Sequence, residues 1–292
     1  MTAAALHADV AAPARRGWRA FLWVAALTAV WAVLTYWQPG IQASGVPLTA
    51  MRLFIYAVIA LGLWLGLERT EFSPTQRRNV WLAVIVPYTL WMALMWSAAI
   101  NGAFRPGASP IPVPLVPLAI VVPVLVGLPI LLRSQRIGEV LDAMPPTWLV
   151  GLQVFRVFGS IFLVNWLLNL APGLFALPAG IGDVLTGLFA LPAAISLASG
   201  GADGRKAAIA WNIFGLLDFT LAIAIGLITS PGPLQLIVPS IPNAAVALYP
   251  TVLIPAFTVP SSILLHALSL RQLYRRGRRA ETAAPLPARA LA

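Results

Sequence analysis

The sequence predicts an all-α polytopic membrane protein, a bundle of about eight transmembrane helices with a short interfacial helix on the cytoplasmic side. Hydrophobic residues make up 60% of the 292 residues and charged residues only 10%, against roughly 25% charged residues in an average soluble domain. The mean hydropathy is +0.86. Apolar stretches of about 20 residues, the length that crosses a bilayer core, recur along the chain. Basic residues gather between alternate stretches, as in multi-pass membrane proteins.

Eight apolar stretches define the expected spans. They are residues 21–37, 51–67, 80–100, 113–132, 148–170, 177–197, 207–228 and 248–270. The first follows three arginines as in a signal peptide, but no small-x-small cleavage site follows it, so we interpret it as a retained anchor. Prolines interrupt the fourth, which predicts a kinked or partly re-entrant segment. The spans form one transmembrane domain over 17–279, between disordered tails at 1–16 and 280–292.

The basic residues predict the orientation, because cytoplasmic loops hold the excess of Lys and Arg. With the N-terminus inside, eight spans place sixteen of the nineteen on the cytoplasmic side. These are Arg15, Arg16, Arg19, Arg69, Arg77, Arg78, Arg133, Arg136, Arg205, Lys206, Arg271, Arg275, Arg276, Arg278, Arg279 and Arg289. Only Arg52 and Arg105 fall outside, and Arg156 lies within the fifth span. Both termini are therefore expected in the cytoplasm.

A short amphipathic segment separates the fourth and fifth spans. Over residues 133–146, apolar side chains recur at helical spacing while charged side chains occupy the other side. This pattern predicts a helix in the membrane interface that ends at Pro145 and Pro146. We interpret it as a connector packed against the bundle.

Composition excludes several classes of function. The absence of cysteine removes disulfides, iron–sulfur clusters and thiolate metal sites. The two histidines, His7 and His266, cannot provide a bis-histidine haem within the membrane. No P-loop or Gly-rich phosphate-binding motif is present. The net charge of +10 lies between apolar segments, so we expect contact with anionic headgroups of the cytoplasmic leaflet and no nucleic acid. We therefore expect neither a cofactor nor a metal.

Polar residues concentrate in spans five to seven and form the candidate site. The candidate residues for binding a substrate or an ion are Gln153, Arg156, Asn165, Asp183, Asn212 and Asp218. A charge at bilayer depth costs about 2.5–3.5 kcal/mol even on lenient insertion scales, so the three charged residues require partners or a wet cavity. The helical rise places them at similar depth, and we predict one ionic cluster. Small residues beside them, such as Gly159, Gly182 and Gly215, allow close approach of the helices.

Gly180-Ile181-Gly182-Asp183 resembles the Gly-x-Gly-Asp motif of intramembrane aspartyl proteases. The resemblance covers four residues and implies a second catalytic aspartate on another helix, for which Asp218 is the candidate. Two such carboxylates sharing a proton would suit acid–base hydrolysis. The second aspartate here follows the motif instead of preceding it, and the Tyr-Asp and Pro-Ala-Leu elements of the family are absent.

The leading hypothesis is a transporter of a small solute or ion, with proton coupling as one option, because buried charges in membranes mark substrate and proton pathways. The alternative is a non-transporting membrane subunit or assembly factor whose ionic cluster is structural. An enzyme, including the protease, ranks third. Arginine outnumbers lysine by 18 to 1, which we take as the codon bias of a GC-rich bacterium, so we expect the bacterial inner membrane.

Overall fold

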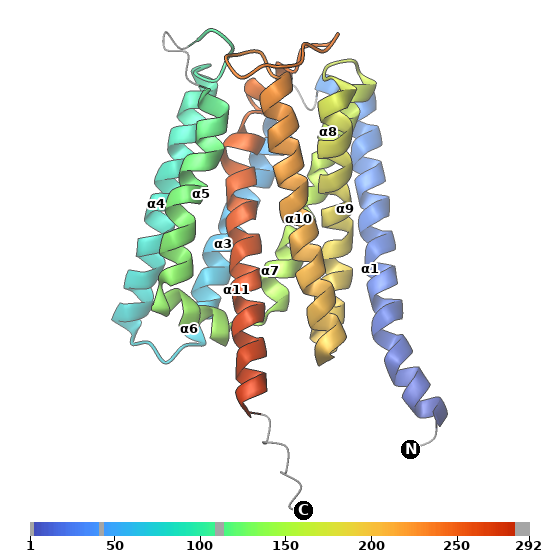
Figure 1. Cartoon of the computed structure of the whole chain (residues 1–292), viewed down its shortest axis with the longest axis vertical. Coiled ribbons are helices and arrows are strands. Elements are labelled where there is room, and N and C mark those ends of the chain that lie inside the picture. The colour runs from blue at the N-terminus through green and yellow to red at the C-terminus, as the bar shows by residue number, and fades with distance from the viewer. Residues whose placement is uncertain (1–2, 41–43, 109–113, 284–292) are drawn as a thin grey trace, which may run out of the picture.

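Figure 1 shows a bundle of long helices that run roughly along one axis. The structure is a computed structural model that describes residues 3–40, 44–108 and 114–283. Within these ranges the chain is mostly helical and contains no β-strand. Seven helices in the described ranges are long and apolar enough to cross a membrane, as expected of a multi-pass membrane protein.

The seven candidate spans follow the predicted order along the chain. They are α1 (Ala3–Trp37, with its apolar part at Arg15–Trp37), α3 (Val46–Glu68), α4 (Pro74–Ile100), α5 (Leu115–Arg133), the segment Thr147–Leu167, α9 (Gly173–Ala198) and α10 (Gly201–Thr229). The α5 helix continues through Pro123 and Pro129. The alternative of a re-entrant fourth segment is therefore wrong for the residues that the structure describes.

The eighth predicted span, residues 248–270, is not one α-helix. It consists of turns, a π-helical segment η3 (Ile254–Thr258) and the first part of α11 (Val259–Ala283). Prolines recur through this stretch, and each removes an amide donor from the helical ladder. The second half of α11 carries a run of arginines. These interruptions explain why this segment does not qualify among the seven apolar helices.

The chain ends differ in part from the sequence expectation. Helix α1 begins at Ala3, so its backbone includes most of the tail over 1–16 that we expected to be disordered. At the other end, α11 continues to Ala283. Residues 1–2 and 284–292, which belong to the two predicted tails, lie outside the described residues.

The fifth span changes helix type in its middle. It begins as α7 (Thr147–Leu152), continues as the 3-10 segment η1 (Gln153–Gly159) and ends as α8 (Ser160–Leu167). Short 3-10 stretches inside longer helices often mark a hinge or a functional position. Here the stretch carries Gln153 and Arg156, two of the predicted site residues.

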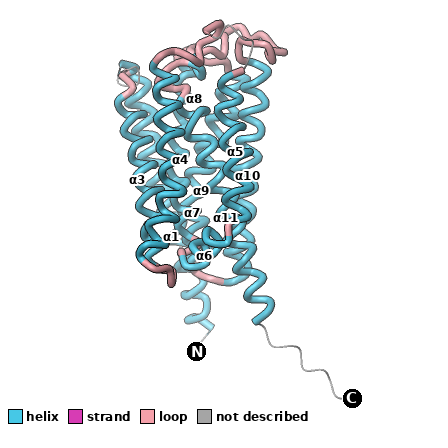
Figure 2. The backbone as a smooth tube through the Cα atoms, turned by 90° about the vertical axis from the view of Figure 1, so that its left-hand side faces the viewer, coloured by secondary structure: helices cyan, strands magenta, loops and turns pink. Residues whose placement is uncertain are grey.

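Both ends of the described chain lie at the same end of the bundle. Helix α1 starts there, α11 ends there, and α6 (Gln135–Ala143) lies across it (Figure 1). The most extensive loop segments gather at the opposite end (Figure 2), which we call the loop end. Residues 101–108 and 230–244 belong to it.

Burial distinguishes central from peripheral spans. In the apolar windows of α1, α4 and α5 only 11–17% of the residues are buried, whereas the share is 56% for Thr147–Leu167 and 44% for α9. The outer helices expose many large apolar side chains, as lipid contact requires. Of the three spans that we expected to form the functional core, the fifth and the sixth therefore lie centrally. The seventh, α10, is no more buried than α3, at 28% each.

Helix α6 confirms the predicted amphipathic connector. Ser134 caps its start by accepting a hydrogen bond from the Ile137 amide at 3.3 Å, and the apolar face is buried. The basic end of α11 packs over this helix. Arg275 Nη2 lies 2.5 Å and Arg279 Nη2 2.8 Å from Asp142 Oδ2. Gln272 donates to the carbonyls of Leu141 and Met144. Together these contacts attach α11 to α6.

The Asp142 contacts predict a pH-dependent contribution to stability. Burial alone would raise the pKa of Asp142, but the hydrogen bond from Arg275 and the charges of Arg275, Arg279 and Arg276 outweigh burial and lower this pKa. A lowered pKa stabilises the fold above the unfolded value of 3.8, and the contribution disappears as the pH falls through the folded value. We expect Asp142→Asn to lower the free energy of unfolding by about 1 kcal/mol at pH 7.

Thermal unfolding in detergent between pH 3 and pH 7 measures this effect. The difference between wild type and Asp142→Asn should be full above pH 3.8, shrink as the pH falls below that value, and vanish once the pH is below the lowered pKa of Asp142 in the folded protein. Asp203→Asn is the matched control, because its carboxylate is fully exposed and lies 3.9 Å from the exposed Lys206 ammonium. A difference that persists unchanged at pH 3 would contradict the assignment.

Candidate functional site

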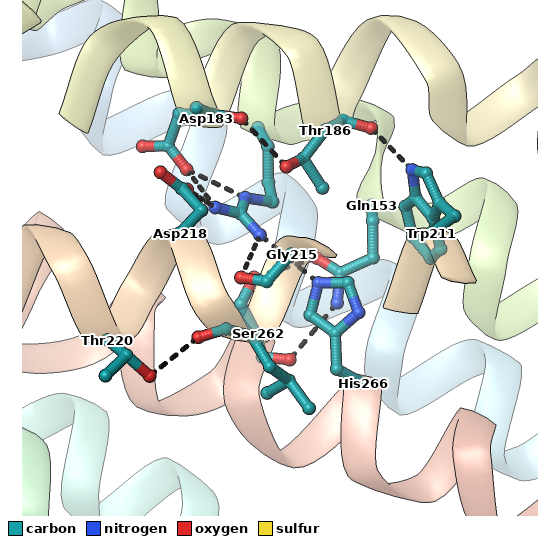
Figure 3. Close-up of polar contacts among 12 residues, drawn as sticks. Gln153, Asp183, Thr186, Trp211, Gly215, Asp218, Thr220, Ser262 and His266 are labelled. Atoms are coloured by element: carbon teal, nitrogen blue, oxygen red, sulfur yellow. Dashed lines mark hydrogen bonds and ion pairs between the residues drawn. The ribbon is translucent and has the colours of Figure 1, made fainter. Parts of the chain in front are cut away.

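Three charged side chains from three different spans meet inside the bundle. Arg156 comes from η1, Asp183 from α9 and Asp218 from α10. Figure 3 shows the two carboxylates facing each other from neighbouring helices. The Arg156 side chain is 1% exposed, and those of Asp183 and Asp218 are 13% and 5% exposed. The structure therefore confirms the predicted ionic cluster, which we call the triad.

Arg156 has a partner for each of its three nitrogens. Its Nε donates to Asp183 Oδ1 at 2.7 Å, and its Nη2 pairs with both Asp183 and Asp218. Its Nη1 donates to the Gly215 carbonyl at 3.2 Å. The Phe219 ring centre lies 3.7 Å from the guanidinium carbon, a cation–π contact. With both carboxylates ionised, one positive charge faces two negative charges, so the triad carries a net charge of −1.

Glycines provide the space that the triad occupies. A Cβ at Gly159 would collide with the Asp183 side chain, and one at Gly182 would collide with the Asp218 carboxylate. A Cβ at Gly215 would lie 3.0 Å from Arg156 Nη1. The small residues predicted to permit close approach thus lie directly against the charged groups. Their role here is steric, because larger residues would separate the charged partners.

A hydrogen-bonded chain extends from the triad through His266. Arg156 Nη1 lies 3.2 Å from His266 Nε2. Arginine can only donate, so this ring nitrogen accepts and the proton resides on Nδ1. Nδ1 then donates to Asn212 Oδ1 at 2.9 Å. Asn212 Nδ2 in turn donates to the Ala208 carbonyl and to Ser269 Oγ, at 2.8 and 3.1 Å. The geometry therefore assigns a neutral histidine in the Nδ1–H tautomer.

The other predicted polar residues occupy different environments. Gln153 and Ser262 form a pair: the Ser262 hydroxyl donates to Gln153 Oε1 at 2.8 Å, and Gln153 Nε2 donates to the Ser262 carbonyl at 3.2 Å. Figure 3 shows both near His266. Asn165 is buried on α8 but is not among the residues lining the cavity described next. Gln153 and Asn212 do not line that cavity either, and the assignment of Asn165 to the site stays a prediction.

A cavity of about 360 Å³ connects the triad with the loop end. Both carboxylates line its inner part, while exposed residues such as Arg105 and Pro233 line the outer part. Its walls are mainly apolar. They include Ile120, Phe162, Phe175, Ala222, Val246 and Ile254. Asp183 and Asp218 therefore lie at the bottom of an apolar cavity that reaches the loop-end surface.

The arrangement gives little support to proton sharing between the aspartates. Arg156 Nη2 pairs with one oxygen of each carboxylate, so a guanidinium and not a shared proton bridges the two groups. The resemblance of Gly180–Asp183 to the aspartyl protease motif therefore corresponds to a different local arrangement. Gly182 provides space for the Asp218 side chain.

Two important contacts of Arg156 were not predicted from the sequence. His266 and Phe219, which both contact the guanidinium, are not among the candidate site residues that the sequence predicts. A signal for His266 was present: Ser262, His266 and Ser269 recur at spacings of four and three residues, which places three polar groups on one helix face. That face lies against Gln153 and Asn212.

A known protein family matches the part of the chain that holds the triad. Residues 113–274 match a family model described as a domain of unknown function, DUF8737, and the chain belongs to this family. The match begins at the fourth span and includes the triad and His266. No curated protein and no solved structure matches the chain.

Proposed function

We propose that this chain is a proton-coupled membrane transporter of a small cation, and that Asp183 and Asp218 bind the cation and the proton in turn. The observation that carries the proposal is the cavity, which runs between apolar walls and ends at both carboxylates. A buried cluster with net charge −1 attracts a cation or a proton and repels an anion. Binding one cation would neutralise the site.

The two ends of the site differ in a way that suits alternating access. On the loop-end side the carboxylates face the cavity. Towards the opposite end, the Gln153–Ser262 pair and the chain from His266 to Ser269 fill the space between helices. The 3-10 segment η1 carries Gln153 and Arg156, and Ile254 of the π-helical segment η3 lines the cavity. Such breaks in the α-helical ladder are common at functional hinges. Movement at these breaks would open the second side.

The alternative is a membrane subunit in which the triad only joins three helices. The contacts of Arg156 favour this reading, because each of its nitrogens has a partner and the guanidinium is buried. Fully satisfied buried networks rigidify a fold without further activity. The cavity is the observation that this alternative leaves without a role.

A vesicle assay tests the proposal. Purified protein is reconstituted in liposomes that contain a pH-sensitive dye and an acidic lumen, and Na⁺, K⁺, tetramethylammonium or tetraethylammonium is added outside. We expect at least one cation to raise the luminal pH faster than in protein-free liposomes. Asp183→Asn and Asp218→Asn should each reduce this rate at least tenfold, because an amide neither exchanges a proton nor carries a charge.

Asp203→Asn is the matched control for removing an aspartate, because this exposed carboxylate lies outside the triad. It should retain the wild-type rate. Thermal stability of each variant is measured in parallel, so that loss of folding is not mistaken for loss of transport. Wild-type protein that behaves like empty liposomes, or stable triad variants with the wild-type rate, would reject the transporter and favour the structural subunit.

We further propose eight spans in the bacterial inner membrane, with both termini in the cytoplasm and basic loops against anionic headgroups. The start of α1 and the end of α11 at the same end of the bundle support an even number of spans (Figure 1). The sixteen basic residues that the predicted span order assigns to the cytoplasmic side support the direction. Alkaline phosphatase fused after Gly204 should be inactive, and fused after Pro233 active. The reverse pattern would overturn this orientation.

A further inference from the structure

We infer that the cavity selects an organic monocation with an apolar body over a bare inorganic ion. The inference rests on the proposed function and specifies its substrate class. The cavity combines one surplus negative charge at its inner end with aromatic and aliphatic walls along its length. A ligand complementary to both parts carries one positive charge and several buried carbon atoms.

The oxygen atoms available around the cavity argue against an inorganic cation. A dehydrated alkali ion or divalent ion needs several oxygen ligands to replace its water. The two carboxylates already accept hydrogen bonds from Arg156. The other polar lining residues include Ser230 and Asn243 near the loop end, where Asn243 Nδ2 donates to Ser230 Oγ at 3.2 Å. Asn243 Oδ1 has no hydrogen-bond partner in the part of the chain that the structure describes, but one such oxygen does not replace the hydration shell of an ion. Among the described residues, no group of three His, Cys, Asp or Glu could hold a metal.

The walls favour a cation whose charge is shielded by carbon. Three phenylalanines line the cavity: Phe162, Phe175 and Phe219. Aromatic faces attract alkylated ammonium groups, and such groups lose less hydration energy than a bare ion. Burial of each methylene increases the binding affinity roughly fourfold. Apolar walls thus strengthen binding of an alkylated cation, but they do not supply the oxygen ligands that a bare ion needs.

The size of the cavity sets an upper limit on the ligand. A volume of about 360 Å³ lies near the lower end of the roughly 300–1,000 Å³ typical of small-molecule sites. The single surplus charge limits the ligand to one positive charge. Arg105 at the outer part is exposed, so water and salt screen its repulsion of an entering cation.

Binding of two homologous ammonium ions tests this inference directly. Protein in lipid nanodiscs is titrated calorimetrically with tetramethylammonium, tetraethylammonium and Na⁺, with empty nanodiscs as the blank. Tetraethylammonium has the same charge as tetramethylammonium and four more methylenes. We expect it to bind at least tenfold more tightly, and we expect Na⁺ to bind most weakly. Asp218→Asn should weaken both ammonium ions at least tenfold.

A pair of phenylalanine substitutions on α10 tests the position. Ala222 lines the cavity, whereas Ala224 is exposed and does not line it. Ala222→Phe should weaken tetraethylammonium at least tenfold and change tetramethylammonium less than threefold, because the larger ion needs the lost volume. Ala224→Phe should leave both unchanged. If Ala222→Phe fails to fold, the ratio of the tetraethylammonium and tetramethylammonium affinities of the wild-type protein still tests the inference.

The outcomes separate this inference from the proposed function. Equal affinities for the two ammonium ions, or tighter binding of Na⁺, would overturn the substrate class. Cation-driven proton exchange in the vesicle assay would then still support a transporter of inorganic cations. Absence of binding and of exchange for every cation would reject both proposals together.

Discussion

Replacing Arg156 with alanine should lower the free energy of unfolding by about 3–5 kcal/mol, the loss expected when one partner of a buried ion pair is removed. The substitution leaves Asp183 and Asp218 facing each other without the guanidinium that now binds both. It also leaves the Gly215 carbonyl without this donor. Denaturant or thermal unfolding of the purified protein in detergent measures the loss.

Single neutralisation of either aspartate provides the comparison. Asp183→Asn or Asp218→Asn leaves Arg156 paired with the remaining carboxylate and removes the surplus negative charge. Each should therefore cost less than half as much stability as Arg156→Ala. Arg105→Ala, on the exposed loop, controls for removal of an arginine and should stay within about 0.5 kcal/mol of wild type. If Arg156→Ala proved as stable as this control, the triad would not hold the three helices together.

Replacing Arg52 with methionine should have the opposite effect and raise the free energy of unfolding by about 2 kcal/mol. Arg52 lies on α3 and is 0% exposed, although the charge count assigned it to the outside. Its Nη2 donates to the Pro250 carbonyl at 3.1 Å. Its Nε and Nη1 have no partner among the described residues. Methionine preserves much of the packed volume and removes the buried, poorly satisfied charge.

The two buried arginines, Arg156 and Arg52, differ in their binding partners, so their substitutions should have opposite effects on stability. Arg156 is bound by two carboxylates, whereas Arg52 is bound by a single carbonyl. Both variants are measured under the same unfolding conditions, with Arg105→Met as the exposed control. A loss of more than about 1 kcal/mol for Arg52→Met would contradict the prediction. It would indicate that the free N–H groups of Arg52 bind a partner in the native protein.

The triad could be predicted because its members are charges within apolar spans. Such charges require partners, and the helical rise placed Arg156, Asp183 and Asp218 at similar depth. The neighbouring glycines indicated which helices could approach closely. This reasoning needed only the span order and the position of each charge along its helix. The structure then joined the three residues as expected.

Other features depend on information that the spans do not carry. Near a helix end, an arginine can extend towards the headgroups or turn inwards, and sequence alone did not distinguish these for Arg52. The role of His266 depends on which face of α11 meets α10, a rotation that hydropathy does not specify. The division of residues 248–270 into turns, a π-helical segment and α11 depends on how prolines and neighbouring helices share the freed carbonyls.

The 3-10 geometry of Gln153–Gly159 makes the middle of the fifth span longer than an α-helix of the same residues would be. A 3-10 helix rises about 2.0 Å per residue and turns about 120°, whereas an α-helix rises about 1.5 Å and turns about 100°. Rewinding these seven residues as an α-helix would shorten the span by about 3.5 Å and rotate Arg156 by about 60° relative to Gln153. The guanidinium would turn away from both aspartates, and α8 would move towards α7 along the span. A local change of helical pitch is therefore sufficient to uncouple the charged groups.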